Sequence, residues 1–233
     1  MPKKEPSQPV SPLDIGGQAV IEGVMMKNKD NLAIAVRLEN GEIKLKNEKL
    51  NPLPKFLKLP IIRGFTVLFY VLIIGIKALV WSANQSLGKE EELTITELVG
   101  TLFLSLLFAV VIFVGVPFAI TNISGLKGVL FNIVEGLIRI VLFVAYIFII
   151  SFMKDIHRMF QYHGAEHMAA NCYEDGKELI VDNVKKYSTI HPRCGTSFIM
   201  IVLVVSIILF SVITTDVWYY KLLLRLALIP LVA

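Results

Sequence analysis

The residues with the clearest capacity for chemistry lie in one 32-residue window, from His163 to Cys194. The window holds three of the four histidines, His163, His167 and His191, and both cysteines, Cys172 and Cys194. Zinc binds imidazole and thiolate groups in sets of three or four, and a catalytic site keeps one position open for water. The window therefore predicts a transition-metal site, with Zn2+ as the expected ion and another transition metal as the alternative.

The first half of the predicted site is the string His-x-x-Glu-His at residues 163–167. On a helix, His163 and His167 share one face, so both imidazoles can reach a single ion. Glu166 is positioned to act as a general base on metal-activated water, the role of the glutamate in inverted zincin motifs. The alternative is a helix at the membrane surface whose polar residues meet lipid headgroups.

The second half is the string His191-Pro-Arg-Cys194. A turn stiffened by Pro192 could present His191 and Cys194 together, with Arg193 positioning a substrate. These residues could instead cap the apolar segment that follows, and Cys172 could be a small buried hydrophobic residue. Five candidate ligands exceed the four positions of tetrahedral zinc, so the sequence leaves the coordinating set open.

Composition places these residues in a membrane protein. Of the 233 residues 55% are hydrophobic and 18% charged, whereas soluble domains carry about 25% charged residues. The net charge of +4 is too small to indicate nucleic acid, and the basic residues gather at the N-terminus and in loops beside apolar segments. That pattern is typical of contact with an anionic lipid bilayer.

Four apolar segments predict transmembrane helices. They cover residues 98–126, which contain no charge, 128–153, 197–215, and a last segment from Tyr219. The last segment stops at Ala233 without a polar boundary, which predicts a truncated chain.

An additional apolar segment, residues 61–81, is harder to place. Only 13 uncharged residues separate Arg63 from Lys77, too few to cross about 30 Å of hydrocarbon. We therefore expect an interfacial or re-entrant helix, followed by a linker over residues 82–92. This arrangement puts the N-terminus and residues 154–196 on the cytoplasmic side, as the positive-inside rule prefers. In that compartment both cysteines are expected to be thiols.

The N-terminal part predicts a small β unit. The run Ala19–Met26 resembles a strand, and residues 32–38 and 41–45 alternate around Asn40-Gly41, a strong hairpin signal. Such a unit needs a partner surface, and Gly16-Gly17 allows a tight turn or a close backbone approach.

Charged residues outside the window have more than one interpretation. Glu22 is either a further ligand, a carboxylate that orients a histidine or acts in catalysis, or a surface glutamate. Glu135 and Arg139, four residues apart, can form an ion pair that Arg63 and Arg225 could join. That network either locks the helices together or lines a polar path.

Four strings resemble the YqhQ family of bacterial membrane proteins. They are Ile15-Gly-Gly-Gln-Ala-Val-Ile-Glu-Gly-Val-Met-Met26, Tyr162-His-Gly-Ala-Glu-His167, Asn171-Cys-Tyr-Glu174 and His191-Pro-Arg-Cys-Gly-Thr-Ser197. The resemblance runs from about residue 13 to the end. It implies a metal-dependent enzyme, a label that itself rests on these His, Glu and Cys positions.

Together these observations predict a mostly α-helical, multi-pass protein of the bacterial inner or plasma membrane with a cytoplasmic metal-site head. The expected activity is a zinc-dependent hydrolase acting on a lipid, lipid-linked or membrane-peptide substrate, and a homo-oligomer is left open. The rivals are a scaffold with a structural metal, and a transporter using Glu135, Arg139 and Arg225. The expected segments are a disordered tail (1–12), the β unit (13–50), the interfacial helix and linker (51–93), a transmembrane hairpin (94–153), the metal-site segment (154–196) and further spans (197–233).

Overall fold

The computed structural model describes residues 15–51, 54, 63–86, 95–211, 217, 219, 220, 223 and 224. The predicted N-terminal tail, Arg225 and the expected last span lie wholly or mostly outside these residues. The chain divides into two compact units: residues 1–92 with 155–193, and residues 93–154 with 194–233.

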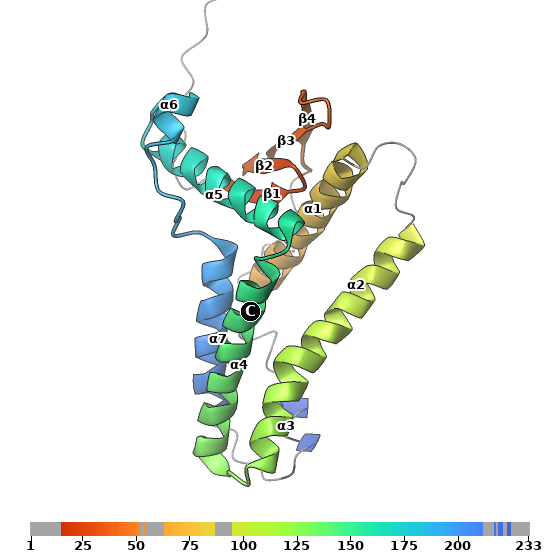
Figure 1. Ribbon diagram of the computed structural model, residues 1–233, viewed down its shortest axis with the longest axis vertical. Helices are drawn as coiled ribbons and strands as arrows, with labels where there is room; N and C mark the ends of the chain where they lie inside the picture. Colours follow the sequence, from red (N-terminus) through yellow and green to blue (C-terminus); the bar gives the residue numbers. More distant parts are fainter. Residues whose placement is uncertain are drawn as a thin grey trace, which may run out of the picture. The chain divides into compact units, whose positions relative to one another are not determined.

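The first unit is built on a four-stranded antiparallel sheet in the order β1-β2-β3-β4. Its strands are β1 (Ile15–Val20), β2 (Gly23–Asn28), β3 (Asn31–Arg37) and β4 (Ile43–Lys49) (Figure 1). The β3–β4 hairpin turns through Gly41, whose φ is 86°. The hairpin predicted around Asn40-Gly41 is confirmed.

The single strand predicted over Ala19–Met26 is wrong, because the chain turns back in the middle of that run. Val20 pairs with Gly23 across the two residues Ile21 and Glu22. Glu22 has a φ of 51°, in the left-handed region, and Gly23 leaves room for strand β3, since a Cβ there would lie 2.0 Å from the Ala35 carbonyl oxygen. The run is therefore a β-hairpin with Glu22 in its turn.

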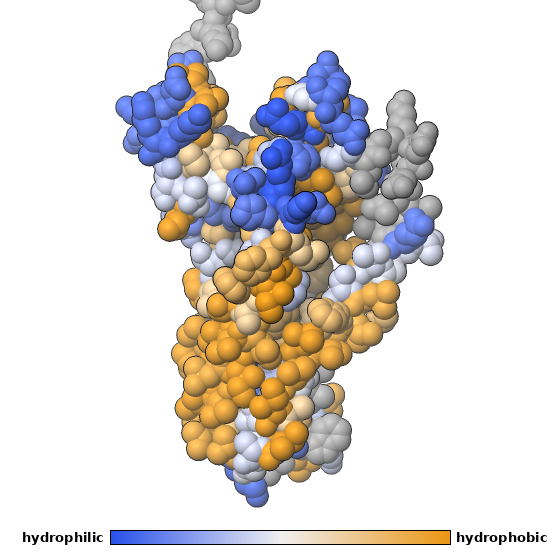
Figure 2. Space-filling view, in the orientation of Figure 1, coloured by the Kyte–Doolittle hydropathy of each residue, from blue (hydrophilic) through white to orange (hydrophobic). Residues whose placement is uncertain are grey.

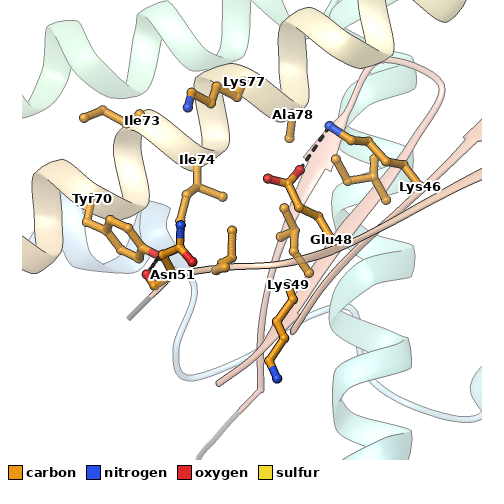
Figure 3. Close-up of a pocket in the computed structure, with 12 residues that line it drawn as sticks. Lys46, Glu48, Lys49, Asn51, Tyr70, Ile73, Ile74, Lys77 and Ala78 are labelled. Atoms are coloured by element: carbon orange, nitrogen blue, oxygen red, sulfur yellow. Dashed lines mark hydrogen bonds and ion pairs between the residues drawn. The ribbon is translucent and has the colours of Figure 1, made fainter. Parts of the chain in front are cut away.

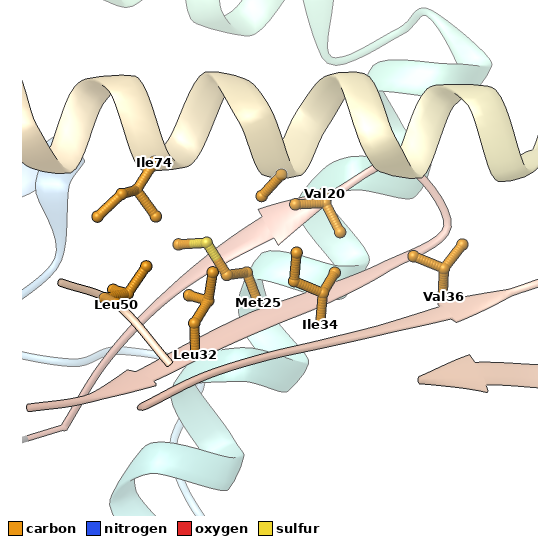
Figure 4. Packing of buried hydrophobic residues seen from close by; sticks show 8 residues of the cluster. Val20, Met25, Leu32, Ile34, Val36, Leu50 and Ile74 are labelled. Carbon is orange, nitrogen blue, oxygen red and sulfur yellow. The ribbon is translucent and has the colours of Figure 1, made fainter. Parts of the chain in front are cut away.

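Helix α1 (Arg63–Ser86) packs lengthwise on one face of this sheet. Near its start the Tyr70 hydroxyl donates to the Asn51 carbonyl at 2.9 Å (Figure 3). Near its end the Ser82 hydroxyl accepts the Ile21 amide at 3.1 Å. Between them lies the apolar core of the unit (Figure 4), made of Val20, Met25, Leu32, Ile34, Val36, Leu50, Ile74 and Ala78.

Residues 63–86 thus form one continuous helix. The predicted linker over residues 82–92 is wrong for its first part, because Ser82 is fully buried and the helix continues to Ser86. The hydrogen bond from Ile21 and the packing of Ala78 extend the helix beyond the point where apolar residues give way to polar ones. Residues 87–94 lie outside the described part of the chain.

Helix α5 (Lys154–Glu174) lies on the opposite face of the sheet. Gln18 of β1 contacts α1 at Gly75, whereas the next residue back, Gly17, contacts Glu166 of α5. Successive residues of a strand point to opposite faces, so the two helices cover the sheet from both sides. The short helix α6 (Val181–Val184) follows α5.

The second unit is helical and apolar. It contains α2 (Ile95–Val110), a π-helical turn η3 (Val111–Gly115), α3 (Val116–Ile123), α4 (Gly128–Ile150) and α7 (Gly195–Ser211). Helices α4 and α7 lie side by side (Figure 1), so closely that a Cβ at Gly136 would lie 2.3 Å from Ile207. Figure 2 shows the surface of these helices as largely hydrophobic.

Three helices of the described chain are long and apolar enough to span a membrane: Thr66–Ser86, Val99–Ile123 and Gly128–Ile150. The expectation that the segment around residues 61–81 is too short to cross is therefore wrong as to length, because its helix continues past Lys77 to Ser86. Gly195–Phe210 is a shorter apolar helix. The fold is thus mostly helical, with a small N-terminal antiparallel sheet, as the sequence predicts.

The predicted pair inside α4 is confirmed. An Arg139 Nη nitrogen lies 2.5 Å from a Glu135 carboxylate oxygen, and Arg139 Nε donates to the Phe113 carbonyl at 2.8 Å. Phe113 belongs to the π-helical turn, which carries backbone carbonyls out of the regular helical ladder. The guanidinium therefore ties α4 to the preceding helix.

Candidate metal centre

The histidine pair on α5 is placed by ordinary helix geometry. His163 and His167 lie one turn apart, with ring centroids 4.3 Å from each other, and a ring nitrogen of each lies within 4.8 Å of the other. The shared face that the sequence predicts is therefore present. Burial and the nearby His167 lower the pKa of His163, so it is neutral at pH 7, the form that can ligate a metal.

His167 is oriented by a backbone carbonyl. It is 5% exposed, and its Nδ1 lies 2.7 Å from the Thr189 carbonyl oxygen. A carbonyl only accepts hydrogen bonds, so Nδ1–H is the donor, and in the neutral ring the lone pair is on Nε2. A carbonyl that fixes the tautomer in this way is the usual companion of a histidine that ligates metal.

Glu166 lies beside that lone pair. Its carboxylate is 3.5 Å from His167 Nε2. Burial raises the pKa of Glu166 above its ordinary value, and the nearby His167 and His191 offset only part of that increase. The side chain also presses on the backbone of β1, because a Cβ at Gly17 would lie 2.1 Å from Oε1. The close approach predicted for Gly16-Gly17 is thus found at Gly17.

His191 reaches the same region from the loop after α6. Its ring centroid is 5.8 Å from that of His167. Its Nδ1 accepts the Arg193 amide at 3.3 Å, and its Nε2 lies 3.3 Å from a Glu174 oxygen. Both ring nitrogens thus have protein partners, so His191 must give one of them up to ligate an ion.

Glu174 is the residue that sequence reasoning missed. Its carboxylate contacts both His191 Nε2 and the Arg193 guanidinium. Arg193, which the sequence predicts as a substrate-positioning residue, is therefore held by this carboxylate. Glu174 lies seven residues after His167, which puts it on the same face of a helix. That spacing could have identified it.

The two cysteines are not joined in a disulfide, and they lie in different surroundings. Cys172 is fully buried, and its Sγ lies 3.7 Å from the Glu178 carbonyl. It follows His167 by five residues, which points it away from the histidine face of α5. Cys194 begins the C-terminal segment of the second unit, with its thiol 2.9 Å from the Thr196 hydroxyl. The turn predicted before it is present at Pro192 and Arg193.

Glu22 fastens the β1–β2 turn to α5. Its carboxylate accepts two nitrogens of Arg158 at 2.9 Å and the Tyr162 hydroxyl at 3.1 Å. The hydrogen bond from Arg158 lowers the pKa of Glu22. One face of α5 carries Arg158, Tyr162 and Glu166, which are spaced four residues apart. The face of α5 that contacts the sheet therefore includes Glu166 of the candidate site.

Comparison with known proteins places the chain in a family. Residues 59–233 match the family described as "Protein of unknown function (DUF1385)". The chain is 32% identical over 245 residues to the "Uncharacterized protein YqhQ" of Bacillus subtilis strain 168, an alignment covering 93% of this chain and 74% of that protein. No solved structure matches the chain. The family match over more than half of the chain and the identity to YqhQ confirm the resemblance seen in the four strings, and they show that this protein belongs to the DUF1385 family and to the YqhQ family.

Proposed function

We propose that this protein is a membrane-embedded, zinc-dependent hydrolase whose ion is held by His163 and His167. The observation that carries the proposal is the hydrogen bond from His167 Nδ1 to Thr189. It leaves the Nε2 lone pair beside Glu166 and near the His163 ring. Two imidazoles with an adjacent carboxylate fit the donor set of zinc.

The remaining ligands of the proposal come from the second string. Cys194 follows His191 by three residues in the chain, and a thiolate there would complete a His/Cys set. His191 is the competing ligand, available if Glu174 releases its Nε2. Cys172 is not part of the proposed set, because its thiol contacts the Glu178 carbonyl.

The proposed chemistry needs a proton acceptor and a polar substrate group. Zinc, when bound, lowers the pKa of water and polarises a carbonyl or phosphoryl oxygen. Glu166 accepts the proton from the attacking water and returns it to the leaving group. Glu174 holds Arg193 close to His191, where its guanidinium can meet an anionic part of the substrate.

The proposed setting is the inner or plasma membrane, with the sheet and α5 on the cytoplasmic side. Helices α2 to α4 supply the spans. Helix α1 is proposed to lie in the interface, because a polar contact at Ser82 and the sheet core at Ile74 and Ala78 occupy one of its faces. A lipid, lipid-linked or membrane-peptide substrate follows from that location.

The test is metal content of the purified full-length protein. His163→Ala and His167→Ala are each expected to lose zinc, whereas His157→Ala, an exposed histidine on the same helix, is expected to retain it. Equal zinc in all four proteins would end the proposal.

A structural metal is the alternative, favoured by the contacts of Asn171 with the Ser188 and Ile190 carbonyls, which already bind the 188–191 loop to α5. An ion there would reinforce that attachment without catalysis. Glu166→Gln separates the two functions: it keeps folding and metal in both, and abolishes hydrolysis of a lipid-linked substrate only if Glu166 is the base.

A further inference from the structure

A cavity of about 430 Å³ lies in the first unit, between α1 and strands β3 and β4 (Figure 3). It is distinct from the histidine site, which lies on the α5 side of the same sheet. Its size is within the range of about 300–1,000 Å³ that small-molecule sites occupy. Its chemistry divides into an apolar floor and a basic rim.

The floor is continuous with the core of the unit. Leu32 and Ile34 of β3 and Ile74 and Ala78 of α1 belong to the buried cluster and also line the cavity. An occupant that reaches them must carry apolar groups, because polar groups buried there would lose their hydration without a partner.

The rim is positively charged. Lys46, Lys49 and Lys77 line the cavity together with one carboxylate, Glu48. Glu48 pairs with Lys46 at 3.1 Å, and the Lys49 side chain extends away from α1 (Figure 3). Three lysines against one glutamate leave the lining with a positive balance of charge, and Lys77 has no carboxylate among the other residues that line the cavity except Glu48, which already pairs with Lys46; this balance suits an anion.

An apolar surface leads away from this rim along α1. Ile73 lines the cavity, and it belongs to a run of exposed apolar side chains in the first turns of the helix: Val67, Leu68, Phe69, Val71, Leu72 and Ile73. An occupant with an anionic head and a long apolar tail would match both the basic rim of the cavity and the exposed apolar side chains of α1. Lipids of the cytoplasmic leaflet have that form.

We propose that this cavity binds an anionic phospholipid, with the phosphate at Lys46 and Lys77 and the acyl chains along Val67–Ile73. The proposal is independent of the metal and of the hydrolase, since none of the histidines takes part. It assigns β4, a lysine-rich edge strand, a role in lipid recognition.

The experiment measures phospholipid binding to the full-length protein in neutral detergent by native mass spectrometry. Phosphatidylglycerol is expected to bind more tightly than phosphatidylcholine. The double variant Lys46→Gln/Lys77→Gln is expected to bind phosphatidylglycerol about tenfold to thirtyfold more weakly, from about threefold to fivefold per lysine. Lys46→Arg/Lys77→Arg is expected to retain most of the binding, which also reports on folding.

The matched control is Lys185→Gln/Lys186→Gln, which removes two exposed charges from the same unit and is expected to bind like the wild type. The proposal is overturned if the Lys46/Lys77 double variant binds as the wild type does, if the control loses affinity equally, or if phosphatidylcholine binds as tightly. Displacement of phosphatidylglycerol by equimolar inorganic phosphate would overturn the lipid as the source and leave a free-phosphate site.

Discussion

Each unit of the protein buries a glutamate on a helix, and the two glutamates have different partners. Glu135 pairs with Arg139 on its own helix at 2.5 Å, and Arg139 is fixed by the Phe113 carbonyl. Glu166 instead meets the imidazole of His167 at 3.5 Å. A guanidinium that is itself hydrogen-bonded to the backbone holds a carboxylate in one position, whereas an imidazole is a group that can exchange protons or ligate a metal ion beside a carboxylate. The first arrangement suits structure and the second suits chemistry.

The largest expected effect comes from breaking the structural pair. Arg139→Met leaves Glu135 buried without its guanidinium and is expected to lower the free energy of unfolding by about 3–5 kcal/mol. Denaturation followed by circular dichroism in detergent measures it. The double variant Glu135→Leu/Arg139→Met is expected to recover most of the loss, since it removes the charge as well. A single variant as stable as the wild type would show that the pair does not lock these helices.

A smaller effect is expected where Glu166 meets the sheet. Gly17→Ala brings a methyl group to 2.1 Å from Oε1, so the carboxylate must shift, at about 1–3 kcal/mol of unfolding free energy. Under the proposed function this variant also loses zinc. Gly16→Ala is the control, because nothing lies within 4 Å of its Cβ position. Equal melting temperatures and zinc contents for the two variants would contradict the described contact.

Glu174 tests how the loop histidine is held. Glu174→Ala removes the acceptor for His191 and Arg193 and is expected to weaken zinc binding about tenfold, with about 1 kcal/mol or less of lost stability. Glu174→Gln keeps an acceptor for His191, and its zinc affinity is expected to lie between those of the wild type and Glu174→Ala. Competition with a chelator measures the affinity. Unchanged affinity in Glu174→Ala would remove this carboxylate from the account of the site.

The smallest effect is expected at Glu22. Its pair with Arg158 is exposed, so Arg158→Met is expected to change the unfolding free energy by less than about 1 kcal/mol. Neither this variant nor Glu22→Gln is expected to change the zinc content, which elemental analysis would measure. Loss of zinc in Glu22→Gln alone would restore Glu22 as a ligand.

Local patterns in the sequence predict much of this fold. Asn40-Gly41 identifies the β3–β4 hairpin, the uncharged run 98–126 identifies a long apolar helix, and the four-residue spacing of Glu135 and Arg139 identifies their pair. Each depends on residues close in the chain, whose geometry is set by one turn or one helix.

What depends on contacts between distant segments was not predictable. The β1–β2 turn at Glu22 has a non-glycine residue with positive φ, held by Arg158 from 136 residues away. Helix α1 continues through Ser82 because β1 supplies a hydrogen bond to it. At the site, the string His-x-x-Glu-His predicts the shared helix face, but the tautomer of His167 depends on the Thr189 carbonyl, 22 residues on.

The proposed function depends on His163 and His167 ligating one zinc ion. X-ray absorption at the zinc edge on the purified full-length protein tests it most directly. We expect imidazole nitrogens at about 2.0–2.1 Å from the zinc, with a sulfur at about 2.3 Å if Cys194 takes part. The signal is expected to be lost in His163→Ala/His167→Ala but not in His157→Ala. A zinc spectrum that is unchanged in the double variant, or wild-type protein without bound metal, would contradict it.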